Sequence, residues 1–145
     1  MRPTKEARFM NSLPKKVYQP VAPDVEKVGK AVLDAAFKVH TALGPGLLEL
    51  VYETTTAYEV RKSGLIVATQ VSLPIFYDGQ ELASGLRLDM LVEKSVIVEL
   101  KSVETMHPVY EAQLLTYLKL TGLRLGFLIN FNVVRLKDGI KRMVV

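Results

Sequence analysis

The first regular pattern of apolar positions begins just after Pro23. Asp24, directly after Pro23, has the side chain of an N-cap, and Gly44-Pro45-Gly46 interrupts the pattern. The apolar positions that recur at helical spacing are Val25, Val28, Val32, Ala35, Ala36 and Val39. We therefore predict a helix from Asp24 to about Leu43.

A second helix is predicted from about Leu47 to Ser63. It ends before Gly64, the residue type that best tolerates the left-handed conformation after a helix. The turn before this helix places Glu49, Tyr52 and Glu53 in its first turns.

From Leu65 onward the apolar period changes to two, which is typical of strands. An Asp78-Gly79 turn predicts one hairpin, and the polar turn Glu93-Lys94-Ser95 predicts a second. The segments that we predict as strands are 66–73, 75–77, from 81 onward, 87–92 and 96–101. All of these pairings are expected to be antiparallel.

The pattern in the last third of the chain predicts one more helix and one more strand. The helix runs from Val109 to Thr121 and is closed by Gly122. Residues 126–130 are continuously apolar up to Asn130, as in a strand covered on both faces, and residues 137–140 suggest a final turn. The predicted order is α-α-β-β-β-α-β with a short C-terminal hairpin extension, an α/β fold.

Composition divides the 145 residues into two parts. Residues 1–23 hold four prolines, five basic residues and one acid, which account for the whole net charge of +4. Residues 24–145 hold 14 basic and 14 acidic residues and are neutral. We expect 1–23 to be a basic flexible arm, or a strap on a partner, and 24–145 to be one domain.

No uninterrupted apolar stretch approaches the roughly 18 residues that span a bilayer, so no membrane partner is expected. The first residues carry charge and proline where a secretion signal needs an apolar core, and the chain has no cysteine. These features favour a soluble, cytoplasmic protein.

The chemistry is concentrated in the second predicted hairpin. Alternation along 96–101 places Glu99 and Lys101 on one face of the strand, opposite Val96, Val98 and Leu100. In the preceding strand Leu88, Met90 and Val92 form the apolar set, which leaves Asp89 on the alternate face, within reach of Glu99. Two neighbouring carboxylates repel each other unless a proton or a cation intervenes, so this pattern predicts a Mg²⁺ site.

Four short motifs along the chain resemble those of a known superfamily. Asp89, nine intervening residues and Glu99-Leu100-Lys101 resemble the signature of PD-(D/E)XK nucleases. Residues 85–89 are similar to the GxxxD motif, and residues 113–117 to the QxxxY motif, of its RecB-like branch. Residues 46–52 are similar to the GxxExxY motif of a small prokaryotic family in the superfamily. The resemblance covers nearly all of residues 25–145.

The resemblance implies a restriction-endonuclease-like core, with a mixed central sheet flanked by helices. It also implies a nuclease that uses Mg²⁺ or Mn²⁺ to hydrolyse phosphodiester bonds of nucleic acid, with DNA favoured over RNA. Asp89, Glu99, the Leu100 carbonyl and Glu49 would hold one or two ions, and Lys101 would position the attacking water. Glu53 lies one turn after Glu49 on the same helical face and is the alternative acid.

Two further motif residues have two readings each. Gln113 could orient an acid or a metal-bound water, and Tyr117, four positions later on the same helical face, could contact a phosphate. Packing of the helix on the sheet, with the amide and hydroxyl satisfied locally, explains both residues equally well.

Other interpretations of the whole pattern stay open. Glu99 and Lys101 could form an exposed salt bridge on the sheet. The fold could serve as a weakly active or inactive module that binds nucleic acid or protein. The chain could also be a homo-oligomer in which the arm packs on a neighbouring subunit.

Overall fold

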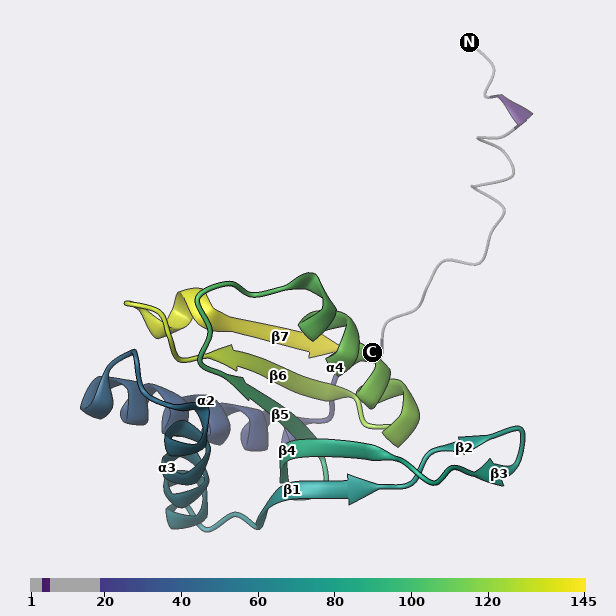
Figure 1. Ribbon diagram of the computed structural model, residues 1–145, viewed down its shortest axis with the longest axis horizontal. Coiled ribbons are helices and arrows are strands. Elements are labelled where there is room, and N and C mark those ends of the chain that lie inside the picture. The colour runs from purple at the N-terminus through teal and green to yellow at the C-terminus, as the bar shows by residue number, and fades with distance from the viewer. Residues whose placement is uncertain (1–3, 6–18) are drawn as a thin grey trace.

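The computed structural model describes residues 4–5 and 19–145 (Figure 1). Most of the predicted arm, residues 1–23, lies outside the described residues. The helices and strands are α2 (Pro23–Leu43), α3 (Glu49–Lys62), β1 (Val67–Leu73), β2 (Phe76–Tyr77), β3 (Gln80–Glu81), β4 (Leu86–Val92), β5 (Val96–Lys101), α4 (Pro108–Thr121), β6 (Leu125–Asn130), the 3₁₀ helix η1 (Leu136–Gly139) and β7 (Ile140–Val144).

The sheet is mixed, as predicted. Its strand order is β1-β4-β5-β6-β7, and β5 and β6 are parallel while the other three pairs are antiparallel. Helix α4 makes the crossover between the two parallel strands. Strands β2 and β3 form a separate hairpin around the predicted Asp78-Gly79 turn, projecting from the end of β1 and β4 (Figure 1). The predicted order α-α-β-β-β-α-β and the C-terminal hairpin are confirmed.

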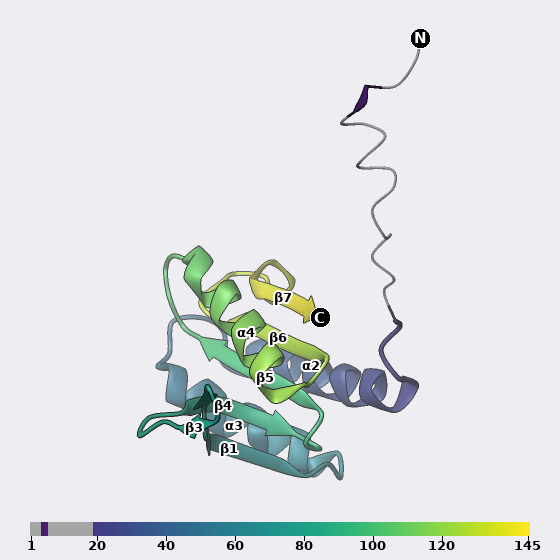
Figure 2. The ribbon, with the colours of Figure 1, turned by 90° about the vertical axis from the view of Figure 1, so that its right-hand side faces the viewer.

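Helices cover both faces of the sheet (Figures 1 and 2). Helices α2 and α3 pack on one face and α4 on the other, so the molecule has two hydrophobic clusters. Every residue of β6 is buried, as expected for a strand covered on both sides. In the part of the chain that the structure describes, no helix is long and apolar enough to cross a membrane.

The start of α2 differs from the prediction. Asp24 is not the N-cap: the helix begins at Pro23, and the N-cap is Ala22, which makes no side-chain cap bond. Proline suits the first helical position because its fixed φ fits a helix and its missing N–H is not needed there. Asp24 lies in the first turn, where its charge favours the positive end of the helix dipole.

The second helix begins at Glu49 instead of Leu47 because the preceding loop is tied down. The Tyr52 hydroxyl donates to the Gly44 carbonyl at 2.6 Å and accepts the Leu47 N–H at 3.1 Å. The Ser102 hydroxyl, just after β5, donates to the Leu47 carbonyl at 2.6 Å. The loop therefore joins the start of α3 to the end of β5, and Glu49 is the first residue of the helix.

The predicted apolar set of β4 is wrong in one respect. Met90 and Val92 pack in the cluster under α2 and α3, but Leu88 packs in the cluster under α4. Simple alternation would keep all three on one face. The change of face occurs at Asp89, opposite Gln70, whose φ of +52° departs from strand geometry.

Candidate active site

Asp89 and Glu99 lie where the backbone pairing of β4 with β5 stops. The paired residues run from Val92 with Val96 to Met90 with Val98. Beyond that point, hydrogen bonds between backbone N–H groups and side-chain carboxylates join the two strands. The Leu100 N–H donates to Asp89 Oδ2 at 2.9 Å, and the Asp89 N–H donates to Glu99 Oε1 at 3.2 Å. Each carboxylate therefore accepts a backbone hydrogen bond from the neighbouring strand, and the two acids lie side by side.

Burial makes the charged form of Glu99 unfavourable next to Asp89. Glu99 is only 5% exposed, and its pKa is raised to about 9, first by burial and then by the charge of Asp89 and a hydrogen bond with it. Within residues 19–145, neither carboxylate has an ion-pair partner. A proton or a cation relieves the repulsion between such groups. The alternative interpretation, an exposed salt bridge between Glu99 and Lys101, is not found among these residues.

Helix α3 brings both of its candidate acids toward the same place. Burial raises the pKa of Glu49, and the negative charges of Asp89 and Glu53 raise it further, while Lys101 lowers it. Glu53 is 6% exposed; burial raises its pKa, and Asp89 adds to the shift. Both acids are thus electrostatically coupled to Asp89.

Lys101 ends β5 with its ammonium group over an aromatic ring. Its Nζ lies 4.5 Å from the centre of the Tyr110 ring, a cation–π contact with helix α4. It is close enough to Glu49 to lower the pKa of that acid. The Lys101 ammonium therefore lies near the acids of the site, but within the described residues it forms no ion pair with any of them.

Helix α4 contributes one of its two predicted residues to this place. Burial raises the pKa of the Tyr117 hydroxyl, and the charges of Glu99 and Asp89 raise it further, so this hydroxyl is electrostatically coupled to both acids. Gln113, one turn earlier, is exposed. Within the described ranges, no hydrogen bond joins it to Asp89 or Glu99.

Sequence reasoning missed two residues that support this region. Gln70 of β1 donates from Nε2 to Glu53 Oε2 at 2.8 Å. Asn130, at the end of β6, accepts the N–H of Val103 and donates to its carbonyl, which fixes the loop after Lys101. Asn130 carried a signal, because a buried amide at the end of an apolar strand needs partners. Gln70 carried none.

The donor set fits a hard cation such as Mg²⁺ or Mn²⁺. Asp89 and Glu99 offer carboxylate oxygens, and α3 adds further acids nearby. Among the described residues, no group of three or more acidic, histidine or cysteine side chains is close enough to form a ready-made metal site. Mg²⁺ does not require one, because it is usually held by one or two carboxylates and keeps several waters.

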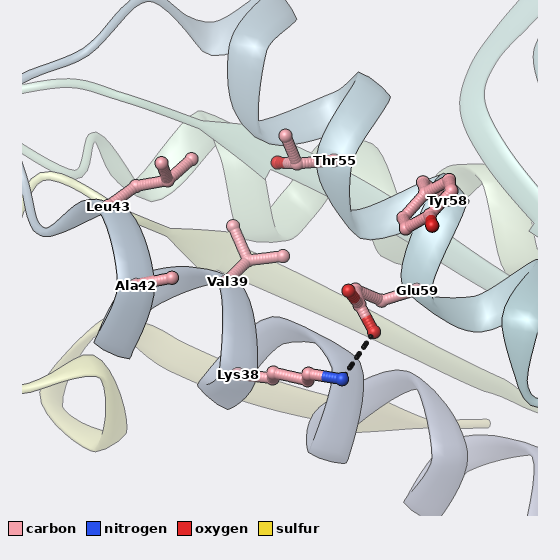
Figure 3. A pocket seen from close by; sticks show the side chains of 7 residues that line it. All are labelled: Lys38, Val39, Ala42, Leu43, Thr55, Tyr58 and Glu59. Carbon is pink, nitrogen blue, oxygen red and sulfur yellow. Dashed lines mark ion pairs between the residues drawn. The ribbon is translucent and has the colours of Figure 1, made fainter.

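A pocket of about 170 Å³ lies elsewhere, between α2 and α3 (Figure 3). Its walls are mostly apolar, and Lys38 and Glu59 pair across its edge at 3.0 Å. None of the acids coupled to Asp89 lines it. The pocket is therefore a feature of the helical layer and not part of the acidic group.

A family model described as the PD-(D/E)XK nuclease superfamily matches residues 26–143. Comparisons with curated proteins and with solved structures found no match.

Proposed function

Because the chain belongs to the PD-(D/E)XK nuclease superfamily, we propose that it is a divalent-metal-dependent nuclease that hydrolyses phosphodiester bonds, with DNA preferred over RNA. The observation that carries the proposal is the pair of hydrogen bonds that holds Asp89 and Glu99 side by side. Within the superfamily, the motifs at 46–52, 85–89 and 113–117 favour the GxxExxY family and the RecB-like branch.

In this proposal Asp89, Glu99, the Leu100 carbonyl and Glu49 would hold Mg²⁺ or Mn²⁺. When bound, such an ion polarises the scissile phosphate and lowers the pKa of the attacking water. With its pKa of about 9, Glu99 holds a proton at neutral pH and must release it to act as a ligand. The affinity of the site for Mg²⁺ or Mn²⁺ should therefore increase as the pH rises.

The remaining residues act on the substrate. The Lys101 ammonium, steadied by the Tyr110 ring, positions the attacking water and offsets charge that develops on the phosphorane. The Tyr117 hydroxyl, which is electrostatically coupled to the acids, contacts a phosphate oxygen. Gln113, exposed one turn away, orients a water or a substrate group at the rim.

The test is cleavage of single- and double-stranded DNA and RNA with Mg²⁺, with Mn²⁺ and with EDTA. We expect metal-dependent cleavage that falls at least about 100-fold in Lys101→Ala, because the water loses its positioning cation. Lys94→Ala is the matched control, since Lys94 is an exposed lysine in the turn of the same hairpin. Activity that survives both chelation and Lys101→Ala would rule out this mechanism.

One observation favours a second candidate, a nuclease-fold module that binds without useful turnover. Residues 24–145 carry balanced charge, which is not the electrostatic footprint of a nonspecific nucleic-acid binder. Binding that weakens steeply with salt, in the absence of any cleavage, would identify this module. Absence of binding to any nucleic acid would leave a protein partner.

A further inference from the structure

Gln70 has a backbone conformation that residues inside a strand do not normally adopt. Four non-glycine residues in the described part of the chain have φ near +52°. Asp78, Glu93 and Lys94 lie in hairpin turns, where a left-handed residue is part of the turn geometry. Gln70 instead lies inside strand β1, where an extended conformation is expected.

This conformation redirects the Gln70 side chain and coincides with the change of face along β1 and β4, but it does not shift the register of the two strands. Thr69 pairs with Met90 and Val71 pairs with Leu88, so the register is the same on both sides of Gln70. Gln70 stands opposite Asp89, outside the paired residues. A left-handed residue in a strand re-aims its side chain. The Gln70 amide consequently reaches helix α3 and donates to Glu53 at 2.8 Å.

Glu53 needs such a partner. Its side chain is buried, the negative charge of Asp89 disfavours its ionised form, and it has no ion pair within residues 19–145. A buried carboxylate without a donor is costly, and repulsion would turn it away from Asp89. The Gln70 amide holds it against that repulsion.

We propose that Gln70 is a positioning residue, which holds Glu53 toward Asp89 so that α3 contributes this carboxylate to the ion site in addition to Glu49. The inference rests on the proposed function, because it assumes that Asp89 belongs to such a site. A left-handed residue in a strand is unfavourable by itself, and strain of this kind persists where the surrounding structure fixes it.

The decisive variant is Gln70→Asn, measured by calorimetric titration with Mn²⁺ and by thermal unfolding in EDTA. Asparagine tolerates the left-handed conformation and keeps the amide, but it is one methylene too short to reach Glu53. We expect the Kd for Mn²⁺ to rise about 10-fold or more, as for other residues that orient a ligand. The Tm should fall by only about 2–4 °C, the shift that corresponds to the loss of about 1 kcal/mol of hydrogen bonding.

Lys94→Asn is the matched control. It introduces the same residue into the same left-handed conformation, at a turn remote in register from Gln70. We expect Lys94→Asn to leave the Kd for Mn²⁺ unchanged. In a Glu53→Gln background, Gln70→Asn should have no further effect on the Kd, because the group that it positions is gone.

Several outcomes would overturn the inference. An unchanged Kd in Gln70→Asn would remove the positioning role while leaving the proposed nuclease intact. A larger fall of Tm together with weaker binding, repeated in the Glu53→Gln background, would mean that Gln70 serves only the fold. If the wild type binds no Mn²⁺ and cleaves nothing, the proposed function fails first and the inference fails with it.

Discussion

Glu99 lies in the most deeply buried part of the sheet, where a carboxylate is least stable in its charged form. Its pKa of about 9 means that the native protein keeps a proton that the unfolded chain releases near pH 4.5. Below pH 4.5 both states are protonated, and the full contribution to stability is present. Between pH 4.5 and 9 the native state binds more protons, so stability is lost as the pH rises.

We therefore expect Glu99→Gln to flatten the dependence of stability on pH. The buried carboxyl contributes a slope of up to about 1.4 kcal/mol per pH unit in this window, and glutamine does not titrate. Urea unfolding in EDTA at pH 5, 7 and 9 measures the slope. Glu104→Gln, at an exposed position, should keep the wild-type slope. Equal slopes in wild type and Glu99→Gln would show that Glu99 is not protonated in the native state.

Gly85, just before β4, determines how closely the start of that strand approaches the end of β1. A Cβ atom at this position would overlap the backbone carbonyl of Leu73. Leu73 pairs with Leu86, so the contact lies at the open end of the β1–β4 pair. The glycine of the GxxxD motif therefore has a steric role in the strand that carries Asp89.

Gly85→Ala should destabilise the protein by about 1–3 kcal/mol, although residue 85 is exposed, because the obstacle is backbone that cannot move independently. Urea unfolding measures the change. Ser84→Ala, at the exposed position just before it, should stay within about 0.5 kcal/mol of wild type. A Gly85→Ala protein as stable as wild type would mean that the two strands separate easily.

Sequence patterns predicted the elements well because each element has its own period of apolar positions. Two hydrogen bonds join β4 to β5 at Asp89 and Glu99, although alternation does not hold along β4. Alternation fails as a guide where contacts between segments that are distant in the sequence change the backbone conformation. The left-handed Gln70 and the change of face at Asp89 depend on contacts between β1, β4 and α3. Such contacts leave no trace in a local pattern.

Viewed as a whole, the molecule exposes more apolar surface on one helix than its own fold accounts for. Leu48, Leu50 and Tyr58, in and just before α3, are 78%, 66% and 61% exposed. A contiguous exposed apolar surface is typical of an interaction site. Assembly of the chain with copies of itself is one use of such a surface, separate from the interpretation in which the arm packs on a neighbouring subunit.

Light scattering of the full-length protein and of a chain that begins at Val21 tests that interpretation. If the arm packs on a neighbouring subunit, the full-length protein should exceed its monomer mass of 16.2 kDa and the shortened chain should be a monomer. A shortened chain that still assembles would shift the contact to α3, and Leu50→Ser should then weaken it. A monomer mass for both chains would rule out assembly through the arm and through α3.

The hydrogen bond from Leu100 to Asp89 makes one backbone amide a spectroscopic reporter. In a ¹⁵N-labelled sample, the Leu100 resonance senses Asp89 Oδ2 directly, because that oxygen is its acceptor. An ion that draws this oxygen away lengthens the bond and moves the resonance. Ile97, paired with Leu91 in the regular part of the same strand, provides an internal reference. A titration with diamagnetic Mg²⁺ can thus be followed at a single atom, without any nucleic acid present.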